Sequence, residues 1–327
     1  MRPQPWLAPL GLLFGGAAAL KAACYRRGLL RATRLASPVI SVGNLRAGGS
    51  GKTPLVAWIA ALLRDAGQRV AILSRGYGGV FSGEALLVSD GRAVLADAAT
   101  AGDEPVMLAR ALPGVVVAIG PHRDMVGRWL EARLGRFVCV LDDGFQHLRL
   151  HRDLDLVCVE AADLADRPLP AGHLRERPAA LARADLLLVS GASSPAFAPE
   201  RTLAVGRNVE GCYDGAGQRV PTPARPFLVS GIARPERFWS DVAAITGGVA
   251  GHLAFPDHHR FTPQDVAKAN AAARAHQADA IVTTAKDAVR LPPVKGGLPW
   301  CVLRIAAEVP DAARLRERLL AVAGPAA

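Results

Sequence analysis

The fold expected of this chain follows from one stretch, Val42-Gly-Asn-Leu-Arg-Ala-Gly-Gly-Ser-Gly-Lys-Thr-Pro54. It finishes in Gly51-Lys52-Thr53, as does the phosphate-binding loop G-x-x-x-x-G-K-[ST]. Arg46 stands where that pattern has its first glycine. The stretch is therefore either a nucleotide site with an altered first half, or a glycine-rich turn that happens to finish in the same residues.

The flanking segments favour the nucleotide site. Residues 39–42 form an apolar run typical of a buried strand, and residues 52–66 have helical periodicity. A strand, glycine-rich loop and helix point backbone N–H groups at phosphate oxygens. We expect Lys52 to reach the β- and γ-phosphates of ATP and the Thr53 hydroxyl to bind Mg²⁺. The residues predicted to surround the phosphates are Arg46, Ala47, Gly48, Gly49, Ser50, Gly51, Lys52 and Thr53.

The rest of the chain alternates strand and helix patterns. Further strands are predicted at 70–74, 115–119, 137–141, 154–159 and 186–189, which indicates an α/β fold with a P-loop NTPase-like parallel sheet. Residues 192–226 are rich in Pro, Gly and Ser, and they are predicted to be a linker with a short hairpin. Strands at 226–232, 281–284 and 300–305 and a terminal helix then form a second, smaller α/β domain. The predicted division is 1–35 for a membrane-associated helix, 36–191 for the P-loop domain, 192–226 for the linker and 227–327 for the C-terminal domain, with a cleft between the two domains.

The N-terminal segment has the character of a membrane anchor. No acidic residue precedes Asp65, and basic residues flank an apolar run at 6–20. That run is shorter than the roughly 20 apolar residues that span a bilayer. A cleaved signal peptide is the alternative, but a phosphate-binding loop requires cytosolic nucleotide. We therefore expect an uncleaved helix that lies in the membrane interface, with its basic residues on anionic lipid. The family resemblance described below implies that this membrane is the inner membrane and that the protein lies on its cytoplasmic face.

Composition excludes other classes. The net charge is +10, but only five of the 39 basic residues are lysine, which suggests a codon bias rather than a nucleic-acid surface. There is no basic patch interleaved with aromatic residues and no zinc-ligand spacing, so we expect no nucleic-acid partner. The five cysteines form no C-x-x-C pair and are expected to be free thiols. We expect a monomer.

Several acidic residues and a histidine are candidate site residues. Asp142 and Asp143 follow an apolar strand, where a Walker B-type aspartate holds Mg²⁺, although adjacent acids also open turns. Asp103 begins a helical pattern and can be read simply as an N-cap. His258 precedes another helix, one that Thr262 is expected to cap.

Seven motifs in order resemble the tetraacyldisaccharide 4'-kinase (lipid A 4'-kinase) family, from the N-terminal apolar run to about Leu291. They are VGNLRAGGSGKTP, LSRGYGG, GDEP, LDDGFQH, LPAGHLRE, FPDHH and TTAKDAVRL. The family also lacks the glycine that Arg46 replaces. Two departures are His173 within the fifth motif and Ala285 in the seventh, where an acid is expected.

The resemblance implies a kinase that moves the γ-phosphate of ATP to the 4'-hydroxyl of a tetraacyldisaccharide 1-phosphate, a lipid A precursor. By motif, Lys52 and Thr53 bind phosphate and Mg²⁺, and Asp142, Asp143 and Glu176 surround the metal. Asp103 is the implied base and is paired with His258; because the two lie in different halves, we expect domain closure on bound substrates to bring them together. Arg75, Tyr77, Gln146 and Arg175 are implied nucleotide-binding residues, and His147 matches a further motif position.

Two other classes remain as alternatives. A P-loop GTPase or ATPase switch, or a metallochaperone-type protein, shares the loop, but guanine selection uses N/T-K-x-D, whereas Lys286 and Asp287 are adjacent here. An exported binding protein with a leader cleaved near Ala23 is the other.

Overall fold

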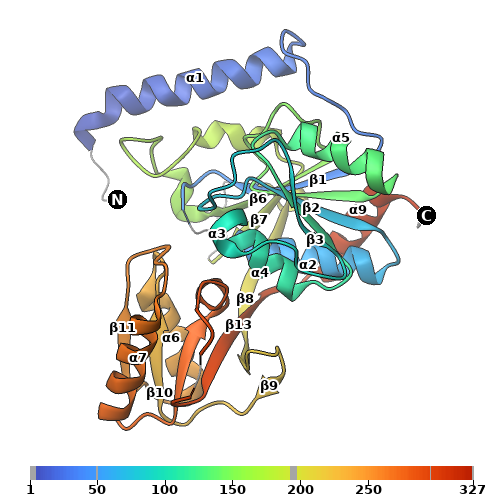
Figure 1. Cartoon of the computed structure of the whole chain (residues 1–327). Helices are drawn as coiled ribbons and strands as arrows, with labels where there is room; N and C mark the ends of the chain where they lie inside the picture. Colours follow the sequence, from blue (N-terminus) through green and yellow to red (C-terminus); the bar gives the residue numbers. More distant parts are fainter. Residues whose placement is uncertain (1–4, 49–50, 192–196, 295, 326–327) are drawn as a thin grey trace.

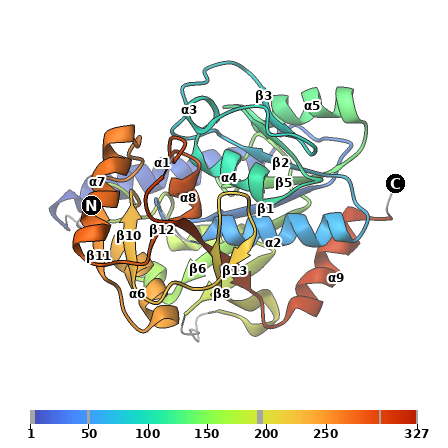
Figure 2. The ribbon, with the colours of Figure 1, turned by 60° about the horizontal axis from the view of Figure 1, so that its bottom comes forward.

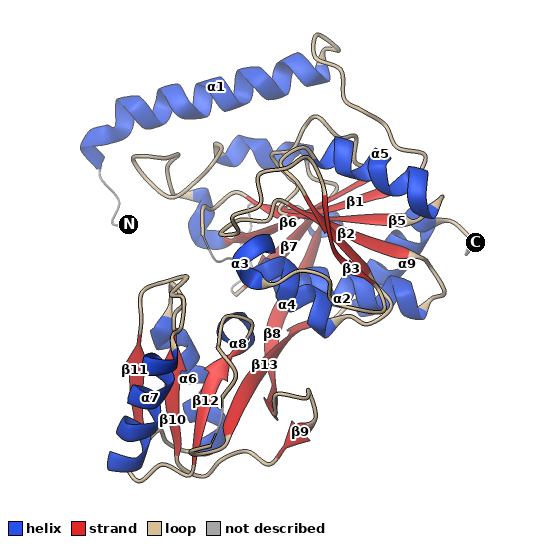
Figure 3. Ribbon diagram, in the orientation of Figure 1, coloured by secondary structure: helices blue, strands red, loops and turns tan. Residues whose placement is uncertain are grey.

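The structure is a computed structural model that describes residues 5–48, 51–191, 197–294 and 296–325. Its strands form one 13-stranded mixed sheet, in the order β11-β10-β12-β13-β8-β7-β6-β1-β5-β2-β4-β3, with β9 paired to β8 (Figures 1 and 3). Helices cover the sheet, so the predicted α/β class with a parallel P-loop sheet is confirmed.

The N-terminal half of the sheet consists mainly of parallel strands. These are β1 (Val39–Asn44), β2 (Val70–Ser74), β4 (Val116–Ile119), β5 (Val138–Asp142), β6 (Leu154–Glu160) and β7 (Leu186–Ser190). Each matches a predicted strand within two residues at either end. The sequence reading missed β3 (Leu86–Asp90), which pairs antiparallel with β4 at the edge of the sheet and is only partly buried.

Helices pack on both faces of this half, because its strands are apolar on both sides. On one face lie α2 (Lys52–Asp65), α3 (Ala98–Ala101), α4 (Asp103–Ala111) and α9 (Ala312–Ala323). On the other lies α5 (Arg123–Leu134), which contributes Val126 and Leu130 to a second core cluster. The short 3₁₀ helices are η1 (Pro5–Leu7), η2 (Ala161–Leu164), η3 (Pro178–Arg183) and η4 (Pro199–Arg201).

The C-terminal half has β10 (Pro226–Ser230), β11 (Gly251–Ala254), β12 (Ala280–Thr284) and β13 (Trp300–Glu308) as strands. Its helices are α6 (Pro235–Thr246), α7 (Pro263–Ala275) and α8 (Ala285–Ala288). Thr262 caps α7 in a capping box with Asp265, as the sequence predicted. Phe227, Phe238 and Phe261 are the largest buried side chains of this half.

The segment predicted as a linker is not irregular, and the prediction is wrong for residues 202–213. They form β8 (Thr202–Tyr213), whose first residues pair parallel with β7 and whose later residues pair antiparallel with β13. Exposed small and polar residues interrupt β8, so it lacks the apolar run of a buried strand. The short hairpin was expected, and β9 (Arg219–Val220) forms it with β8. Residues 192–196 lie outside the described part of the chain.

The terminal helix belongs to the core of the N-terminal half. Leu315 and Leu319 of α9 are fully buried in the cluster that also holds residues of α2, and Figure 2 shows the two helices together. The predicted C-terminal range 227–327 therefore contains a helix that packs on the opposite half. The chain crosses between the halves twice, through β8 and through β13.

Helix α1 (Ala8–Arg26) lies along the outside of the N-terminal half (Figure 1). A Cβ on Gly11 would stand 2.8 Å from the carbonyl oxygen of Pro168, so only glycine allows this approach. Arg177 Nη2 donates to the carbonyl of Leu12 at 2.9 Å. Other apolar side chains on the helix, including Leu13 and Leu20, are exposed. Among the described residues this is the one helix that is long and apolar enough to cross a membrane, judged by length and composition alone.

Candidate active site

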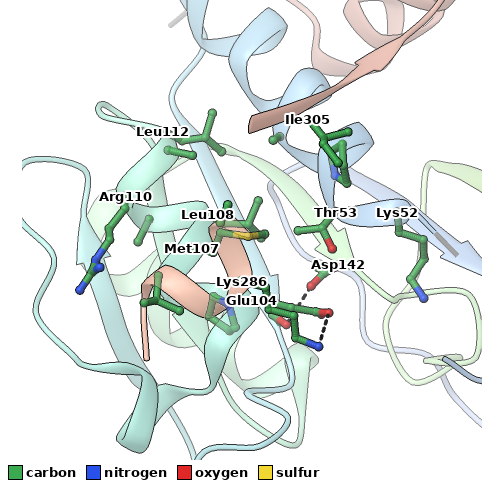
Figure 4. A pocket seen from close by; sticks show the side chains of 18 of the residues that line it. Lys52, Thr53, Glu104, Met107, Leu108, Arg110, Leu112, Asp142, Lys286 and Ile305 are labelled. Carbon is green, nitrogen blue, oxygen red and sulfur yellow. Dashed lines mark hydrogen bonds and ion pairs between the residues drawn. The ribbon is translucent and has the colours of Figure 1, made fainter. Parts of the chain in front are cut away.

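A cavity of about 1740 Å³ lies between the two halves and contains most of the predicted site residues. Residues of α2, the end of β5 and α4 form its N-terminal wall, and residues of α8, β13 and the loop before α7 form its C-terminal wall. Figure 4 shows Lys52, Thr53 and Asp142 in this cavity, whose lining also includes the apolar side chains of Met107, Leu108 and Ile305.

The phosphate-binding loop leads into α2 as predicted. Lys52 is the first residue of the helix, and its Nζ donates to Asn44 Oδ1 at 2.8 Å and contacts Asp143 Oδ1 at 2.8 Å. Ala47, Gly48, Gly51 and Thr53 also line the cavity. Gly49 and Ser50 lie outside the described residues. The helix N-terminus and a lysine held in place provide the positive end that a polyphosphate requires.

Arg46 is not among the residues that line the cavity, and its role in binding nucleotide stays a prediction. Its Nε contacts Asp163 at 2.8 Å and its Nη2 contacts Asp166 at 3.2 Å. The next residue, Ala47, donates its N–H to the carbonyl of His173 at 2.8 Å. Arg46 therefore fixes the loop to the segment 163–174, and these contacts explain how the loop is held without its usual first glycine.

Asp142 and Asp143 end β5 in different electrostatic environments. Asp142 is 3% exposed and accepts a hydrogen bond from Ser74 Oγ at 3.1 Å. Burial, and next the charge of Glu104, raise its pKa to about 7. Burial also opposes ionisation of Asp143, but Lys52 and Arg175 outweigh it and hold the pKa of Asp143 below its usual value. The backbone of Asp143 is left-handed, with φ 56°.

Thr53 and Asp142 suit Mg²⁺ better than the other predicted ligands do. The Asp142 carboxylate is buried and lines the cavity together with Thr53, and burial raises its pKa although Lys52 and Ser74 act in the opposite direction. Hard oxygen donors of this kind, few in number, are what Mg²⁺ takes from a protein when phosphates supply the rest. Asp143 is already paired with Lys52 and Arg175.

Glu176 is not among the residues that line the cavity, and its role as a metal ligand stays a prediction. It is 5% exposed, and both of its carboxylate oxygens accept hydrogen bonds at 2.9 Å from the guanidinium of Arg183. That guanidinium lies over the ring of Phe145 at 4.5 Å. A carboxylate held by both oxygens in an ion pair fixes the fold of this segment.

The other predicted nucleotide-binding residues line the cavity in two groups. Arg175 contacts Asp143 and lies 3.5 Å from Gln146 Oε1, while Gln146 Nε2 donates to the carbonyl of Asn44 at 3.0 Å. Arg75 and Tyr77 come from the loop after β2. The Tyr77 ring is edge-on to His258 at 5.7 Å, so Tyr77 lies beside the predicted partner of the base.

Asp103 and His258 are in direct contact, although 155 residues separate them. His258 Nδ1 lies 2.8 Å from Asp103 Oδ2 in this structure. The domain closure on bound substrates stays a prediction. Asp103 is not an N-cap: α4 begins at Asp103, its N-cap is Gly102, and no side chain caps it. Gly102 has φ 88°, and a Cβ there would stand 2.3 Å from the carbonyl oxygen of Tyr77.

Three residues at this site were missed in the sequence. Arg290 Nε lies 3.4 Å from Asp103 Oδ2, and Lys286 Nζ lies 3.3 Å from His258 Nε2. Both belong to the motif TTAKDAVRL, and this motif is the only feature of the sequence that indicates them. Arg123 lines the cavity, and burial, together with the charge of Arg75, lowers its pKa to about 10. Nothing in its local sequence distinguished it.

His147, which matched a family motif, lies 3.5 Å from Asp124 Oδ1 at the edge of this region. Burial and the charge of Arg123 lower its pKa to about 3. It is therefore neutral at physiological pH.

Comparisons with known proteins agree with this geometry. Residues 3–324 match the family model described as Tetraacyldisaccharide-1-P 4'-kinase. The chain is 43% identical over 307 residues to the Tetraacyldisaccharide 4'-kinase of Geobacter metallireducens, with 88% of each chain covered. It is 45% identical over 327 residues to that of Anaeromyxobacter sp. (strain Fw109-5), with 93% of this chain and 88% of the relative covered.

A solved structure has the same fold. The "apo" form of LpxK from Aquifex aeolicus in complex with ATP matches with a TM-score of 0.83 and 32% identity, over 97% of this chain and 98% of that one. The family model and the relatives give no support to a GTPase or metallochaperone-type switch. The chain belongs to the tetraacyldisaccharide-1-P 4'-kinase family.

Proposed function

We propose that the cavity carries out transfer of the γ-phosphate of ATP to the 4'-hydroxyl of a tetraacyldisaccharide 1-phosphate, with Asp103 as the base. The observation that carries this assignment is the contact of 2.8 Å between Asp103 and His258, formed between the two halves. His258 lines the same cavity as Lys52 and Thr53, and Asp103 is buried behind it. A sugar hydroxyl is a weak nucleophile, so a carboxylate that accepts its proton accelerates its attack on phosphorus. His258 Nδ1 orients that carboxylate.

The opposite side of the cavity binds ATP. Lys52 places its ammonium beside the transferring phosphoryl group, and backbone N–H groups at the start of α2 contact the other phosphates. In this structure Lys52 contacts Asp143, so phosphate competes with that carboxylate for the ammonium. Met107, Leu108 and Ile305 offer an apolar wall for the adenine ring of ATP.

Thr53 and Asp142 would hold Mg²⁺ at the phosphate end of the cavity. When bound, Mg²⁺ neutralises charge on the β- and γ-phosphates. Asp142 requires its ionised form for this, and a nearby cation stabilises the charge that burial disfavours. Asp143 orients Lys52 and Arg175.

The acylated substrate stays in a lipid bilayer, and α1 would hold the enzyme there. One side of the helix docks on the protein through Gly11 and Arg177, while Leu13 and Leu20 stay exposed. A helix docked lengthwise on its own protein suits the interface of the inner membrane, on the cytoplasmic face, rather than a span across it. We propose that the enzyme acts there as a monomer.

The test of the reaction is phosphate transfer from ATP to a detergent-solubilised tetraacyldisaccharide 1-phosphate, with the phosphorylated position read by NMR. The wild-type enzyme should yield the 4'-phosphate. ATP turnover without a sugar phosphate product would reject the assignment. For the membrane, deletion of residues 1–26 should release a folded protein from anionic vesicles, whereas carbonate should not strip the intact protein. A truncated protein that binds vesicles as tightly as the full chain would contradict the anchor.

A further inference from the structure

Lys286 contacts the proposed dyad on the side away from Asp103. Its Nζ lies 3.3 Å from His258 Nε2, 3.7 Å from Asp257 Oδ1 and 4.0 Å from Glu104 Oε1. Its side chain is 23% exposed. His258 is thus held at both ring nitrogens, by a carboxylate at Nδ1 and by an ammonium at Nε2.

The backbone that carries Lys286 is rigid. Lys286 lies in α8, where the side chain of Thr284 accepts a hydrogen bond from the N–H of Asp287. Asp287 is 0% exposed and accepts hydrogen bonds from Thr284 Oγ1 at 2.7 Å and from the N–H of Gly231 at 3.1 Å. It also pairs with Arg290, the residue that contacts Asp103. One buried carboxylate therefore holds the segment that supports both members of the dyad.

The two contacts of His258 are compatible with one tautomer of the neutral ring. An ammonium group only donates hydrogen bonds, so Nε2 has to present its lone pair to Lys286. The proton is then on Nδ1, where it is donated to Asp103. In the other tautomer, N–H would face the ammonium and a lone pair would face the carboxylate, so both contacts would be repulsive.

We propose that Lys286 is a positioning residue that sets the tautomer of His258, so that Nδ1–H is always directed at Asp103. The inference rests on the proposed roles of Asp103 and His258. A hydrogen bond to one imidazole nitrogen commonly determines which nitrogen carries the proton. The charged groups that face His258 are Asp103 from α4, Asp257 from its own loop and Lys286 from α8, and Glu104 and Arg290 lie behind them.

Removal of the ammonium changes the partner of Nε2. Asp257 Oδ2 lies 3.8 Å from Nε2, so in a Lys286→Met variant a carboxylate becomes the nearest charged group. A carboxylate accepts hydrogen bonds and favours a proton on Nε2. The variant should therefore shift His258 toward the Nε2–H tautomer or the doubly protonated ring.

The experiment is ¹⁵N NMR of the full-length protein in detergent, labelled at its eight histidines, with the His258 signals assigned by a His258→Gln variant. In the wild type, Nδ1 should resonate as protonated and Nε2 as unprotonated. Lys286→Met should move the Nε2 signal toward the protonated range. Lys286→Arg, which keeps a donor, should restore it in part. Lys268→Met is the matched control, because Lys268 is an exposed lysine of α7.

Kinetics on the same variants separate positioning from direct phosphate binding. Lys286→Met should lower kcat roughly 10- to 100-fold, the range for loss of a group that orients a histidine, and change KM for ATP less than about twofold. A protonated Nε2 in the wild type, or signals that Lys286→Met leaves unchanged, would overturn the proposal. So would a large rise in KM for ATP. An active Asp103→Asn enzyme would instead reject Asp103 as the general base. It would not change the conclusion about which nitrogen of His258 carries the proton.

Discussion

Removal of either partner of the Asp103–His258 contact should reveal that the two act as one unit. The contact of 2.8 Å joins a carboxylate that is 7% exposed to an imidazole that is 32% exposed. A hydrogen bond to a charged group contributes about 1.5–3 kcal/mol, which corresponds to a loss of roughly 10- to 150-fold for His258→Gln. Loss of a general base lowers kcat by about 10²–10⁴, the range expected for Asp103→Asn.

The double variant should be little slower than Asp103→Asn alone, because a histidine that orients a missing base has no further effect. The coupling energy should therefore be about 1.5–3 kcal/mol. The assay is kcat for phosphate transfer at saturating ATP, with thermal melts of the same proteins. His259→Gln is the matched control: His259 contacts Asp265 at 3.1 Å and should couple weakly with Asp103. Kinetic losses that add, and that follow the melting temperatures, would refute the dyad.

Three further outcomes follow from the site. Lys52→Ala removes the ammonium beside the phosphoryl group and should lower kcat for phosphate transfer by about 10²–10³, while the melting temperature stays unchanged. Near-full activity of this variant would contradict the role of Lys52. Glu176→Gln weakens the pair with Arg183 and should cost roughly 1–3 kcal/mol of unfolding free energy, while the Mg²⁺ concentration for half-maximal rate stays constant. A shifted Mg²⁺ requirement would restore Glu176 as a ligand. His147 takes up a proton at about pH 6.5 when unfolded but only near pH 3 when folded, so it should destabilise the wild type as pH falls through this window. His147→Gln should therefore lose less stability than the wild type between pH 7 and 5 in urea titrations, and equal losses would reject the lowered pKa.

The phosphate loop could be predicted from the sequence for a local reason. A strand that ends in a glycine-rich loop before a helix has one architecture, so Lys52 and Thr53 could be placed by pattern. Asp103 and His258 came from motif resemblance, and their contact depends on how the two halves pack. No pattern gives that packing.

Where the structure places Arg46 and Glu176 depends on tertiary contacts that no sequence pattern shows. Arg46 resembled a loop residue, but its partners Asp163 and Asp166 lie more than 100 positions away in the sequence. Glu176 is held by Arg183, whose role in the fold no local pattern reveals. The strand β8 was hidden because its exposed residues are small and polar, and α9 has an amphipathic pattern that fits either half. A local pattern predicts an element, whereas its partner has to come from the structure.

Backbone strain marks the residues that the chemistry needs. Among the described residues, three that are not glycine have positive φ: Asp143 at 56°, His258 at 59° and Gln277 at 53°. A left-handed backbone costs a residue with a Cβ about 1–2 kcal/mol. Two of the three are proposed site residues, so their placement lowers the free energy of unfolding.

This strain can be measured at His258 by comparing two truncations. His258→Gly and His258→Ala both remove the imidazole, with its contacts to Asp103 and Lys286, and both should lower kcat to the same extent. Only alanine keeps the Cβ that makes φ 59° unfavourable. Part of the stability that glycine gains at this φ is lost again, because glycine makes the unfolded chain more flexible. His258→Gly should therefore unfold with a free energy about 0.5–1 kcal/mol higher than His258→Ala in denaturant titrations. If alanine were the more stable of the two, the left-handed conformation would store no strain, and the position of His258 would have to be explained by its side-chain contacts alone.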